Sequence, residues 1–377
     1  MTRATGVRRD RSASERAWNF SAGPATLPLP VLERVRDELL SLPGARASIL
    51  EISHRSKAFE AIAEEAGSNL RGLLAIPDAH HVLFLQGGAS LQFAMAPMNL
   101  LGDRVAQYVI TGSWGRRALA EARTVGRADA VWDGASERDT DVPDLGSLTL
   151  DPAAAYVHIT SNETIGGVQF PPDAVSRLRE TPTLVCDLSS DFLSRPIDAP
   201  RYGLMYAGAQ KNAGPAGLTV VALDGALTER IGSGLPAILD YGTHVEHRSL
   251  FNTPPTFAIY VLMHVTRWLR DDVGGLAPMA SRNEEKASLL YEAIDGSGGF
   301  YRGHARPAAR SRMNATWRLA DEDLERRFLD EARANDLLEL RGHRSVGGIR
   351  ASIYNAMPIE GVRALRSFMD DFARRNG

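Results

Sequence analysis

Short apolar runs alternate with amphipathic stretches through the first two thirds of this chain, and this alternation limits the folds it can adopt. The strands that we predict lie at 81–86, 105–110, 155–160, 183–187, 203–207 and 217–223. The predicted helices between and around them lie at 30–41, 57–74, 90–99, 115–124 and 173–179. The pattern indicates an α/β fold on a mostly parallel sheet flanked by helices. Ligands of such folds bind beyond the carboxyl ends of the strands.

The last third of the chain has a different pattern. Residues 254–272 predict a long apolar helix with prolines at its start, where proline is tolerated. The elements that we expect after it are helices near 275–295, 321–335 and 359–374 and strands near 313–319, 337–340 and 348–353. We therefore expect a large domain over 30–272 and a smaller α+β domain over 273–377. Residues 18–29 are expected to pack with the small domain.

Composition excludes several classes of protein. A net charge of −3 gives no electrostatic reason to expect nucleic acid or membrane binding, and no apolar run approaches transmembrane length. The single cysteine, Cys186, excludes a disulfide framework and is expected to be a buried, inert thiol. His244 and His247 lack further ligands at metal-site spacing, so we expect no metal. Residues 1–17 lack the apolar stretch of a signal peptide, which predicts a disordered tail on a cytoplasmic protein.

Lysine is scarce in this chain, because the 43 Lys and Arg residues include only Lys57, Lys211 and Lys286. Unlike arginine, lysine can lose its proton and form a Schiff base. Lys211 closely follows the apolar run 203–207, and Asp187 ends another such run. Pyridoxal phosphate chemistry requires an aspartate and a lysine placed in this way, although a surface lysine in a loop would give the same local pattern. We expect the other two lysines to be solvated.

Further polar or aromatic residues follow predicted strands in the same manner. Gly87-Gly88-Ala89-Ser90 opens a helix after strand 81–86, and a helix N-terminus with small residues can bind phosphate. Trp114 and Thr164 follow strands 105–110 and 155–160. Each signal alone is weak, since many turns contain such residues and most tryptophans pack in cores. Their shared position is the stronger signal, because it predicts that these groups converge on one edge of the sheet.

With these motifs the chain resembles the phosphoserine aminotransferases, a family of class V, fold-type I pyridoxal phosphate enzymes. The resemblance covers the chain after residue 17. It is carried by residues 19–24 (NFSAGP), 53–55 (SHR), 161–165 (SNETI), 207–212 (AGAQKN), 251–256 (FNTPPT) and 342–352 (GHRSVGGIRAS). It implies a seven-stranded, mostly parallel sheet in the large domain.

The resemblance implies a role for each matching residue around pyridoxal phosphate. Lys211 would form the Schiff base, and Asp187 would pair with the pyridine nitrogen. Trp114 would stack on the ring, and Thr164 would bind the 3-oxygen of the ring. The phosphate would be held by Ala89, Ser90 and Gln210, and by Asn252 and Thr253 from a neighbouring subunit. A homodimer with shared active sites is therefore expected.

The resemblance also implies the substrates, L-glutamate and 3-phosphohydroxypyruvate, which would give O-phospho-L-serine and 2-oxoglutarate in serine biosynthesis. Members of the family can also act on 3-hydroxy-2-oxo-4-phosphonooxybutanoate in pyridoxine biosynthesis. Arg350 would bind the α-carboxylate, and His343, Arg344 and Arg55 would receive the distal anion. The chain departs from many relatives at Ala22, where they carry a second serine.

Three alternatives stay open at this point: transfer between alanine or serine and glyoxylate, a lyase or desulfurase, and a non-catalytic pyridoxal phosphate-binding or regulatory protein. Two distal cations argue against the first, because its substrates carry no distal anion. Four arginines, Arg302, Arg306, Arg310 and Arg312, form a basic cluster near the small domain's first predicted strand. The cluster is either a solvated face or a means of raising the local potential for anionic substrates.

Overall fold

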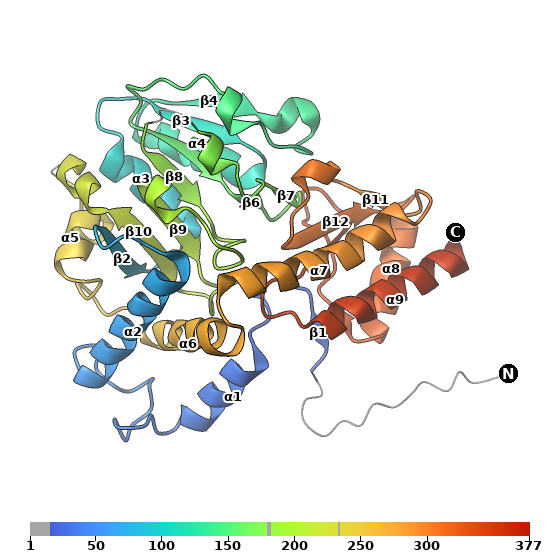
Figure 1. The fold of residues 1–377 in the computed structure, drawn as a ribbon, viewed down its shortest axis with the longest axis horizontal. Coiled ribbons are helices and arrows are strands. Elements are labelled where there is room, and N and C mark those ends of the chain that lie inside the picture. Colours follow the sequence, from blue (N-terminus) through green and yellow to red (C-terminus); the bar gives the residue numbers. More distant parts are fainter. Residues whose placement is uncertain (1–15, 179–181, 233) are drawn as a thin grey trace.

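The structure is a computed structural model that describes residues 16–178, 182–232 and 234–377 (Figure 1). Its centre is a seven-stranded sheet with the strand order β2-β10-β9-β8-β5-β3-β4. The strands are β2 (His80–Leu85), β3 (Ala106–Ile110), β4 (Ala128–Asp133), β5 (Tyr156–Thr160), β8 (Leu184–Asp187), β9 (Leu204–Gly208) and β10 (Thr219–Asp224). Only β10 runs antiparallel to its neighbours. The predicted α/β fold with a mostly parallel sheet is confirmed.

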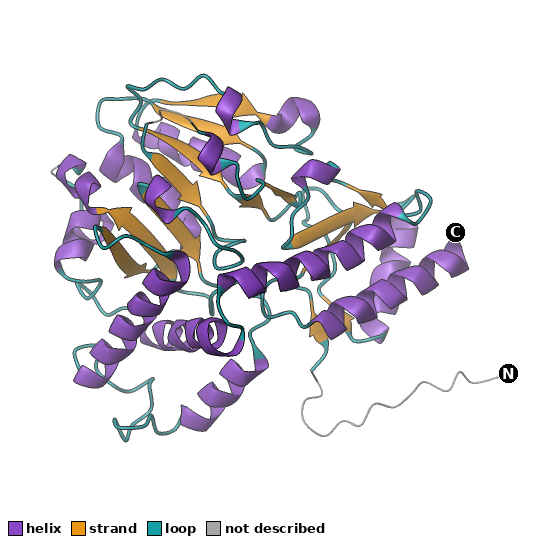
Figure 2. Ribbon diagram, viewed as in Figure 1, coloured by secondary structure: helices purple, strands orange, loops and turns teal. Residues whose placement is uncertain are grey.

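Helices cover both faces of this sheet (Figures 1 and 2). One face packs against α2 (Lys57–Leu74) and α6 (Thr256–Arg267), and the other against α3 (Gly88–Leu100) and α4 (Ser113–Val125). Successive strand residues such as Val185 and Cys186 enter opposite cores, and both are fully buried. Burial on both faces explains why the strands form continuous apolar runs. Two further helices in this part are α1 (Leu29–Glu38) and α5 (Tyr241–Glu246).

Two local predictions in this part differ from the structure. The predicted helix at 173–179 is wrong, since only a short 3-10 turn forms at Val175–Arg177, and residue 179 lies outside the described ranges. A segment this short, placed just after Pro171 and Pro172, cannot recover the free-energy cost of starting an α-helix. Strand β4 was not predicted, because this edge strand is mostly exposed or half-buried and carries aspartates at positions 129 and 133.

The C-terminal part has its own sheet and core. Strand β12 (Asn314–Arg318) pairs antiparallel with β11 (Arg302–Gly303) and β14 (Ile349–Ser352), beside α7 (Leu276–Asp295), α8 (Glu322–Ala334) and α9 (Ile359–Asn376). Its core contains Trp317, Phe328 and Phe372, and Phe20 joins it from the N-terminal segment. There β1 (Trp18–Asn19) pairs in parallel with β13 (Leu337–Leu338). A small hairpin, β6 (Asn162–Glu163) and β7 (Val168–Gln169), faces this sheet from the large one.

Lys286 is buried, so the prediction that it is solvated is wrong. Its side chain lies inside, and its Nζ donates to the carbonyl oxygens of Ile353, Tyr354 and Met357 at 2.9, 2.7 and 3.2 Å. Burial lowers the pKa of the amine to about 7. Because three carbonyls replace its water shell, the amine can be buried, and it fixes the chain after β14 to helix α7.

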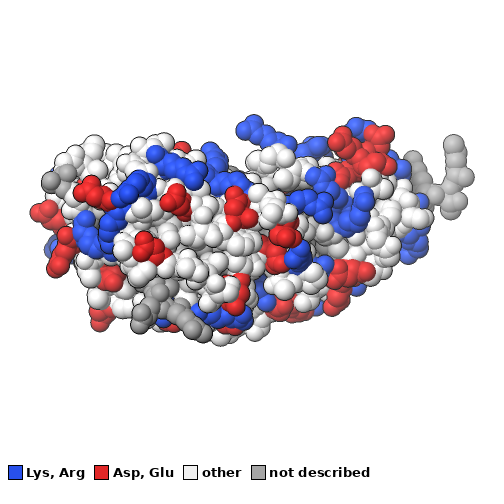
Figure 3. Space-filling model, turned by 90° about the horizontal axis from the view of Figure 1, so that it is seen from above, with Lys and Arg blue, Asp and Glu red and all other residues white. Residues whose placement is uncertain are grey.

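Other sequence expectations concern membrane-spanning helices, metal sites and the single cysteine. In the described ranges no helix is long and apolar enough to span a bilayer, and no cluster of three or more potential metal ligands occurs. Cys186 is buried as expected. Figure 3 shows cationic and acidic side chains interspersed over one face of the molecule. Most of the tail predicted at 1–17 lies outside the described residues.

Candidate active site

Lys211 lies just past the end of β9, and its amine contacts two of the predicted partners. Its Nζ donates to the hydroxyl of Thr164 at 2.6 Å and lies 5.2 Å from the ring centroid of Trp114. Burial lowers the pKa of Lys211, while the nearby carboxylates of Asp187 and Glu163 oppose that shift. A lowered pKa favours the neutral amine, which is the nucleophilic and proton-accepting form.

Asp187 ends strand β8 as a buried carboxylate. Its Oδ1 accepts the backbone N–H of Ser189 at 2.8 Å, and Ser189 Oγ accepts the backbone N–H of Gly208 at 3.0 Å, which joins the ends of β8 and β9. Burial raises the pKa of Asp187, and Lys211 and Ser189 oppose this shift. The described residues provide no salt-bridge partner within 4.0 Å. A buried carboxylate of this kind suits a cationic ring nitrogen as its partner.

Beside Asp187 the sheet carries a layer of aromatic rings that sequence reasoning missed. Tyr206 pairs with Asp187 in register, and its hydroxyl lies 2.7 Å from Nε2 of His158. The His158 ring stacks on Tyr108 with centroids 4.8 Å apart. Burial lowers the pKa of His158 to about 3, so this ring is neutral at physiological pH. The layer therefore adds no cation that would compete for the carboxylate of Asp187.

Trp114 is positioned by Glu163, a second residue that sequence reasoning missed. The Glu163 carboxylate is 1% exposed and accepts the backbone N–H groups of Trp114 and Gly115 at 3.1 and 2.9 Å, in the first turn of α4. A Cβ at Gly112 would come within 2.6 Å of Glu163 Cδ, so the carboxylate fits only against a glycine. Burial raises the pKa of Glu163 to about 7 against the effect of both N–H groups. The sequence signal that could have identified Glu163 is its position inside the 161–165 motif, where a carboxylate stands among the proposed cofactor ligands.

The proposed phosphate ligands surround the same edge of the sheet. Ala89 and Ser90 lie in the first turn of α3, whose N-cap Gly87 has a left-handed backbone with φ 86°. The free N–H groups of such a turn attract anions. Gln210 precedes Lys211, and its carbonyl oxygen accepts the N–H of Ala25 at 2.9 Å. Gly23 lies against both side chains, since a Cβ there would be 3.3 Å from Lys211 Cγ.

The predicted substrate residues approach this site from the C-terminal part. Arg350, on β14, points a guanidinium N–H at the carbonyl oxygen of Thr164 at 3.4 Å, and burial lowers its pKa. Partial burial lowers the pKa of His343, and the nearby charges of Arg350, Arg344 and Arg117 lower it further. Arg344 itself is exposed. The structure thus brings Arg350 and His343 to the side of the site where Thr164 lies.

Three predicted residues are exposed in the single chain. Asn252 and Thr253 are exposed, and the carbonyl oxygen of Thr253 accepts a hydrogen bond from Gln86 just past the end of β2 at 3.0 Å. Arg55 is exposed before α2, where its backbone N–H donates to Ser53. In the described ranges, none of the three has a hydrogen bond to Lys211 or Asp187.

Ala22, the position in the N-terminal turn where the chain departs from many relatives, still contributes to the site through its backbone. Its carbonyl oxygen accepts the hydroxyl of Tyr354 at 2.9 Å, and Tyr354 in turn receives an N–H of Asn314 at 3.2 Å. The N-terminal turn is therefore attached to the chain that follows β14. This attachment does not require a side-chain hydroxyl at position 22.

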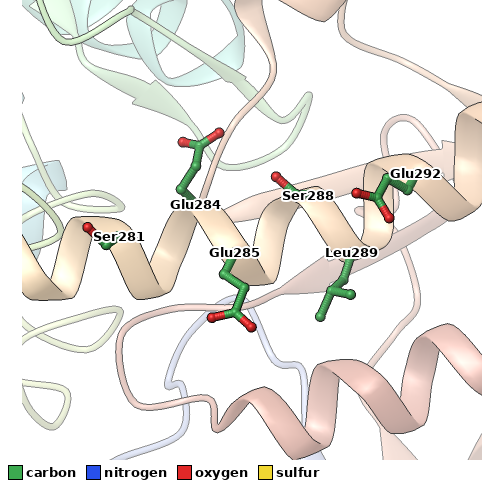
Figure 4. Close-up of a pocket in the computed structure, with 6 residues that line it drawn as sticks. All are labelled: Ser281, Glu284, Glu285, Ser288, Leu289 and Glu292. Atoms are coloured by element: carbon green, nitrogen blue, oxygen red, sulfur yellow. The ribbon is translucent and has the colours of Figure 1, made fainter.

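A depression on α7 has a different character (Figure 4). Its volume is about 490 Å³, and a single helix supplies all of its lining residues: Ser281, Glu284, Glu285, Ser288, Leu289 and Glu292. The three glutamates pair with Arg312, Arg363 and Arg366. Because these charges are already neutralised and no groups converge from other elements, the depression is not a second catalytic site.

Comparison with known proteins defines the class. Residues 17–365 match the model of the family described as aminotransferase class-V, and the chain belongs to this family. It is 51% identical to a phosphoserine aminotransferase of Rhodopirellula baltica over 99% of both chains. A second phosphoserine aminotransferase, from Geobacillus kaustophilus, is 52% identical over 96% of this chain and 99% of its own.

Solved structures agree with these relatives. The phosphoserine aminotransferase of Bacillus circulans subsp. alkalophilus superposes with a TM-score of 0.92 and 48% identity, over 97% of this chain and 100% of that one. A pyridoxal phosphate-bound phosphoserine aminotransferase of Trichomonas vaginalis gives a TM-score of 0.88 and 39% identity, over 94% and 100%. The resemblance that the motifs indicated is confirmed, and with it the fold-type I architecture.

Proposed function

We propose that this protein is a pyridoxal phosphate-dependent phosphoserine transaminase. It moves an amino group between L-glutamate and 3-phosphohydroxypyruvate and gives O-phospho-L-serine and 2-oxoglutarate. One observation carries the proposal: the amine of Lys211 lies between the hydroxyl of Thr164 and the ring of Trp114, with the buried Asp187 nearby. The names of the relatives, at about half identity over nearly the whole chain, support the same activity.

The residues of this edge fit pyridoxal phosphate, which when bound withdraws electrons from the α-carbon of an amino acid. Asp187 would keep the ring nitrogen protonated, because an opposite charge favours the charged form. Trp114 would cover one face of the ring, and its indole N–H is buried without a partner among the described residues. Thr164 would bind the ring's 3-oxygen. The phosphate would meet the start of α3 at Ala89 and Ser90, and also Gln210.

Lys211 would move the proton. Its amine, once free, can take the proton from the substrate α-carbon and return it one position along, as general base and then general acid. The lowered pKa of Lys211 makes the neutral amine available for this step. An arginine could not act in this way near neutral pH.

Arg350 would hold the α-carboxylate, since a guanidinium fork matches the two oxygens of that group. Its contact with the Thr164 carbonyl aims it at the same face of the site as Lys211. His343 and Arg344 follow β13 in the adjoining loop and would receive the distal phosphate or carboxylate, together with Arg55. The alternative transfer to glyoxylate from alanine is not favoured, because it would leave these cations without a partner.

We infer that the active enzyme is a homodimer. The support is the family resemblance, in which Asn252 and Thr253 match a pair that holds the phosphate from the neighbouring subunit, and both residues are exposed in the single chain. We also infer a large domain over 30–272 and a small one over 273–377. The separate core around Trp317 and Phe328 supports this division.

An absorbance experiment tests the function most directly. The purified holoenzyme should change its spectrum on addition of L-glutamate, as the cofactor takes the amino group, and recover it on addition of 3-phosphohydroxypyruvate. Alanine followed by glyoxylate should drive the same cycle far more slowly. Efficient turnover of that second pair would favour the glyoxylate alternative, and no spectral change with any amino donor would indicate a non-catalytic binding protein.

A further inference from the structure

A cavity of about 660 Å³ opens beside Arg350. We call it the arginine cavity, because Arg138, Arg302, Arg318 and Arg350 line it together with His304. Its walls come from the hairpin after Thr164, from β11 and β12, and from the loop between Gly342 and Ile349. No aspartate or glutamate is among its lining residues. The site around Lys211 and the arginine cavity therefore share Arg350 and otherwise use different groups.

Three other arginines of the basic cluster have acidic partners. Arg306 pairs with Glu137 and Asp141, and Arg310 pairs with Asp295 at 2.7 Å. Arg312 pairs with Glu284. Three members of the sequence's basic cluster are thus neutralised on the surface. The fourth, Arg302, lines the cavity.

The arginines of the cavity are held differently. Arg302 donates to the carbonyl oxygen of Leu319 at 2.8 Å. Arg138 and Arg318 have no carboxylate within 4.0 Å in the described ranges. The guanidinium of Arg318 lies against the loop backbone at Gly347, where a Cβ would be 3.4 Å from its Nη1, and this glycine has a left-handed φ of 68°. The loop between Gly342 and Ile349 therefore accommodates the guanidinium of Arg318 without supplying a carboxylate to pair with it.

Several unpaired cations in one concavity repel each other, and the walls of a concavity focus their field on its interior. A small anion that enters would relieve the repulsion, and planar guanidinium groups match both phosphate and carboxylate oxygens. Arginine stays charged at every physiological pH, so the attraction does not depend on titration.

We propose that the arginine cavity is a second anion-binding site, which captures a small dianion with a phosphate or two carboxylate groups and delivers it to Arg350. This inference rests on the proposed function, because the substrates of that reaction carry such groups. It goes beyond that function by separating capture of the substrate from its binding for reaction. Arg302 and Arg318 would act in capture, whereas His343 and Arg344 would hold the distal group during the reaction.

Chemical labelling tests the site without any turnover. Phenylglyoxal modifies exposed guanidinium groups, and peptide mapping of the holoenzyme gives a rate for each arginine. Inorganic phosphate at twice its dissociation constant should slow labelling of Arg318 and Arg302 about threefold, by simple occupancy. Labelling of Arg333, an exposed arginine on α8 that does not line the cavity, should keep its rate.

Glutarate, used in a parallel titration, separates the two ligand chemistries. Protection by phosphate alone would support a site for phosphate groups, and protection by both anions would support a site for any dianion. An unchanged rate at Arg318 through both titrations would overturn the proposal. Equal slowing at Arg333 would overturn it as well, because it would show general screening of charge. This result stands even if the protein does not transaminate phosphoserine.

Two matched variants test delivery. R318Q and R333Q each remove one positive charge from the C-terminal part, and the described residues give neither side chain a hydrogen bond that the change would break. At low ionic strength R318Q should lower kcat/KM for phosphoserine roughly three- to tenfold, and this difference should shrink towards one at ~0.5 M salt. R333Q should stay within about 1.5-fold of wild type.

R302Q serves as a second cavity variant if R318Q does not fold, and it should show the same dependence on salt. Equal losses in R318Q and R333Q, or a loss that salt does not change, would overturn delivery through the arginine cavity. A wild-type enzyme with no activity on phosphoserine would instead count against the proposed function. The two failures are therefore distinguishable.

Discussion

The site has two regions that are built in different ways. The cofactor edge of the sheet contains Lys211, Asp187 and Glu163, and the substrate side contains the residues proposed to bind the distal anion and the phosphate from loops. Backbone N–H groups hold Asp187 and Glu163, and the hydroxyl of Thr164 holds the amine of Lys211, all within one chain. Arg344 and Asn252 lie exposed in loops. The comparison teaches that the chemistry common to the class is fixed by the sheet, whereas substrate choice depends on loops and on a second subunit.

The largest effect should come from Lys211→Ala, which removes the only lysine at the cofactor edge. Multiple turnover should fall at least a thousandfold, since proton transfer by a positioned side chain alone contributes about 10²–10⁴. Borohydride reduction of the wild-type holoenzyme and peptide mapping should place the cofactor on Lys211. Label on Lys57 or Lys286 would contradict the assignment of Lys211 as the lysine that binds the cofactor.

Asp187→Asn should come next. The variant should still bind the cofactor, but removal of the α-proton should slow about a hundredfold or more, because the ring nitrogen loses its charged partner. Stopped-flow absorbance with L-glutamate measures this step. A rate within about threefold of wild type, which is under ~1 kcal/mol, would remove Asp187 from its proposed role.

Arg344→Ala tests the substrate side. Arg344 is exposed in the single chain, but a bound substrate would cover it. Its loss should therefore lower kcat/KM for phosphoserine by a factor that corresponds to about 2–4 kcal/mol, the scale for removing one partner of a buried charge pair. Turnover of alanine, which has no distal anion, should change far less. Equal losses for both amino acids would show that Arg344 supports the fold and does not recognise the distal group.

Glu163→Gln sharpens the account of the cofactor edge. The pKa of Glu163 is raised from 4.5 to about 7, so between those pH values the folded protein binds more protons than the unfolded chain. The contribution of Glu163 to the free energy of unfolding is therefore larger at low pH than at high pH, and this difference is lost as pH rises through about 7. From pH 4.5 to 8 the advantage of wild type over E163Q should fall by about 1–3 kcal/mol.

Urea unfolding of the two apoproteins at both pH values measures that difference. R333Q, which lacks a titrating change, is the control. A wild-type advantage that is the same at both pH values would mean that Glu163 does not titrate in this window. A growing advantage at high pH would reverse the sign and show that its two N–H partners outweigh its burial.

Mixed subunits test the last part of the comparison, the shared site. Lys211→Ala chains and Asn252→Ala/Thr253→Ala chains should each be inactive as homodimers. In a heterodimer one site collects both defects and the other is intact, so an equal mixture should regain about a quarter of wild-type activity. No recovery after verified subunit exchange would contradict a site completed by Asn252 and Thr253.

Sequence reasoning was most successful where burial on both faces gave continuous apolar strands, because the ends of those strands locate Thr164, Asp187 and Lys211. It missed β4, whose exposed edge lacks that pattern. Lys286 and Glu163 were missed for a further reason. Their partners are backbone groups contributed by distant segments, and no residue type marks a carbonyl or an N–H as a partner.

Other predictions remain untested. The roles of Ala89, Ser90 and Gln210 rest on the family resemblance, and the structure adds their place around the sheet edge. The cytoplasmic location also stays a prediction. The homodimer and the domain limits are inferences, because they depend on contacts between chains and on motions that one chain's pattern of apolar residues does not encode.

The pairing of β1 with β13 has a consequence for how the chain is made. Trp18 lies beside Leu337, and the N–H of Ala25 bonds the carbonyl oxygen of Gln210. Strand β1 must therefore wait until more than three hundred further residues have been synthesised before its partner exists. Contacts this distant in sequence form late and slowly. The N-terminal turn beside Lys211 is thus anchored only after residue 337 has been made, and a shorter nascent chain cannot carry a finished active site.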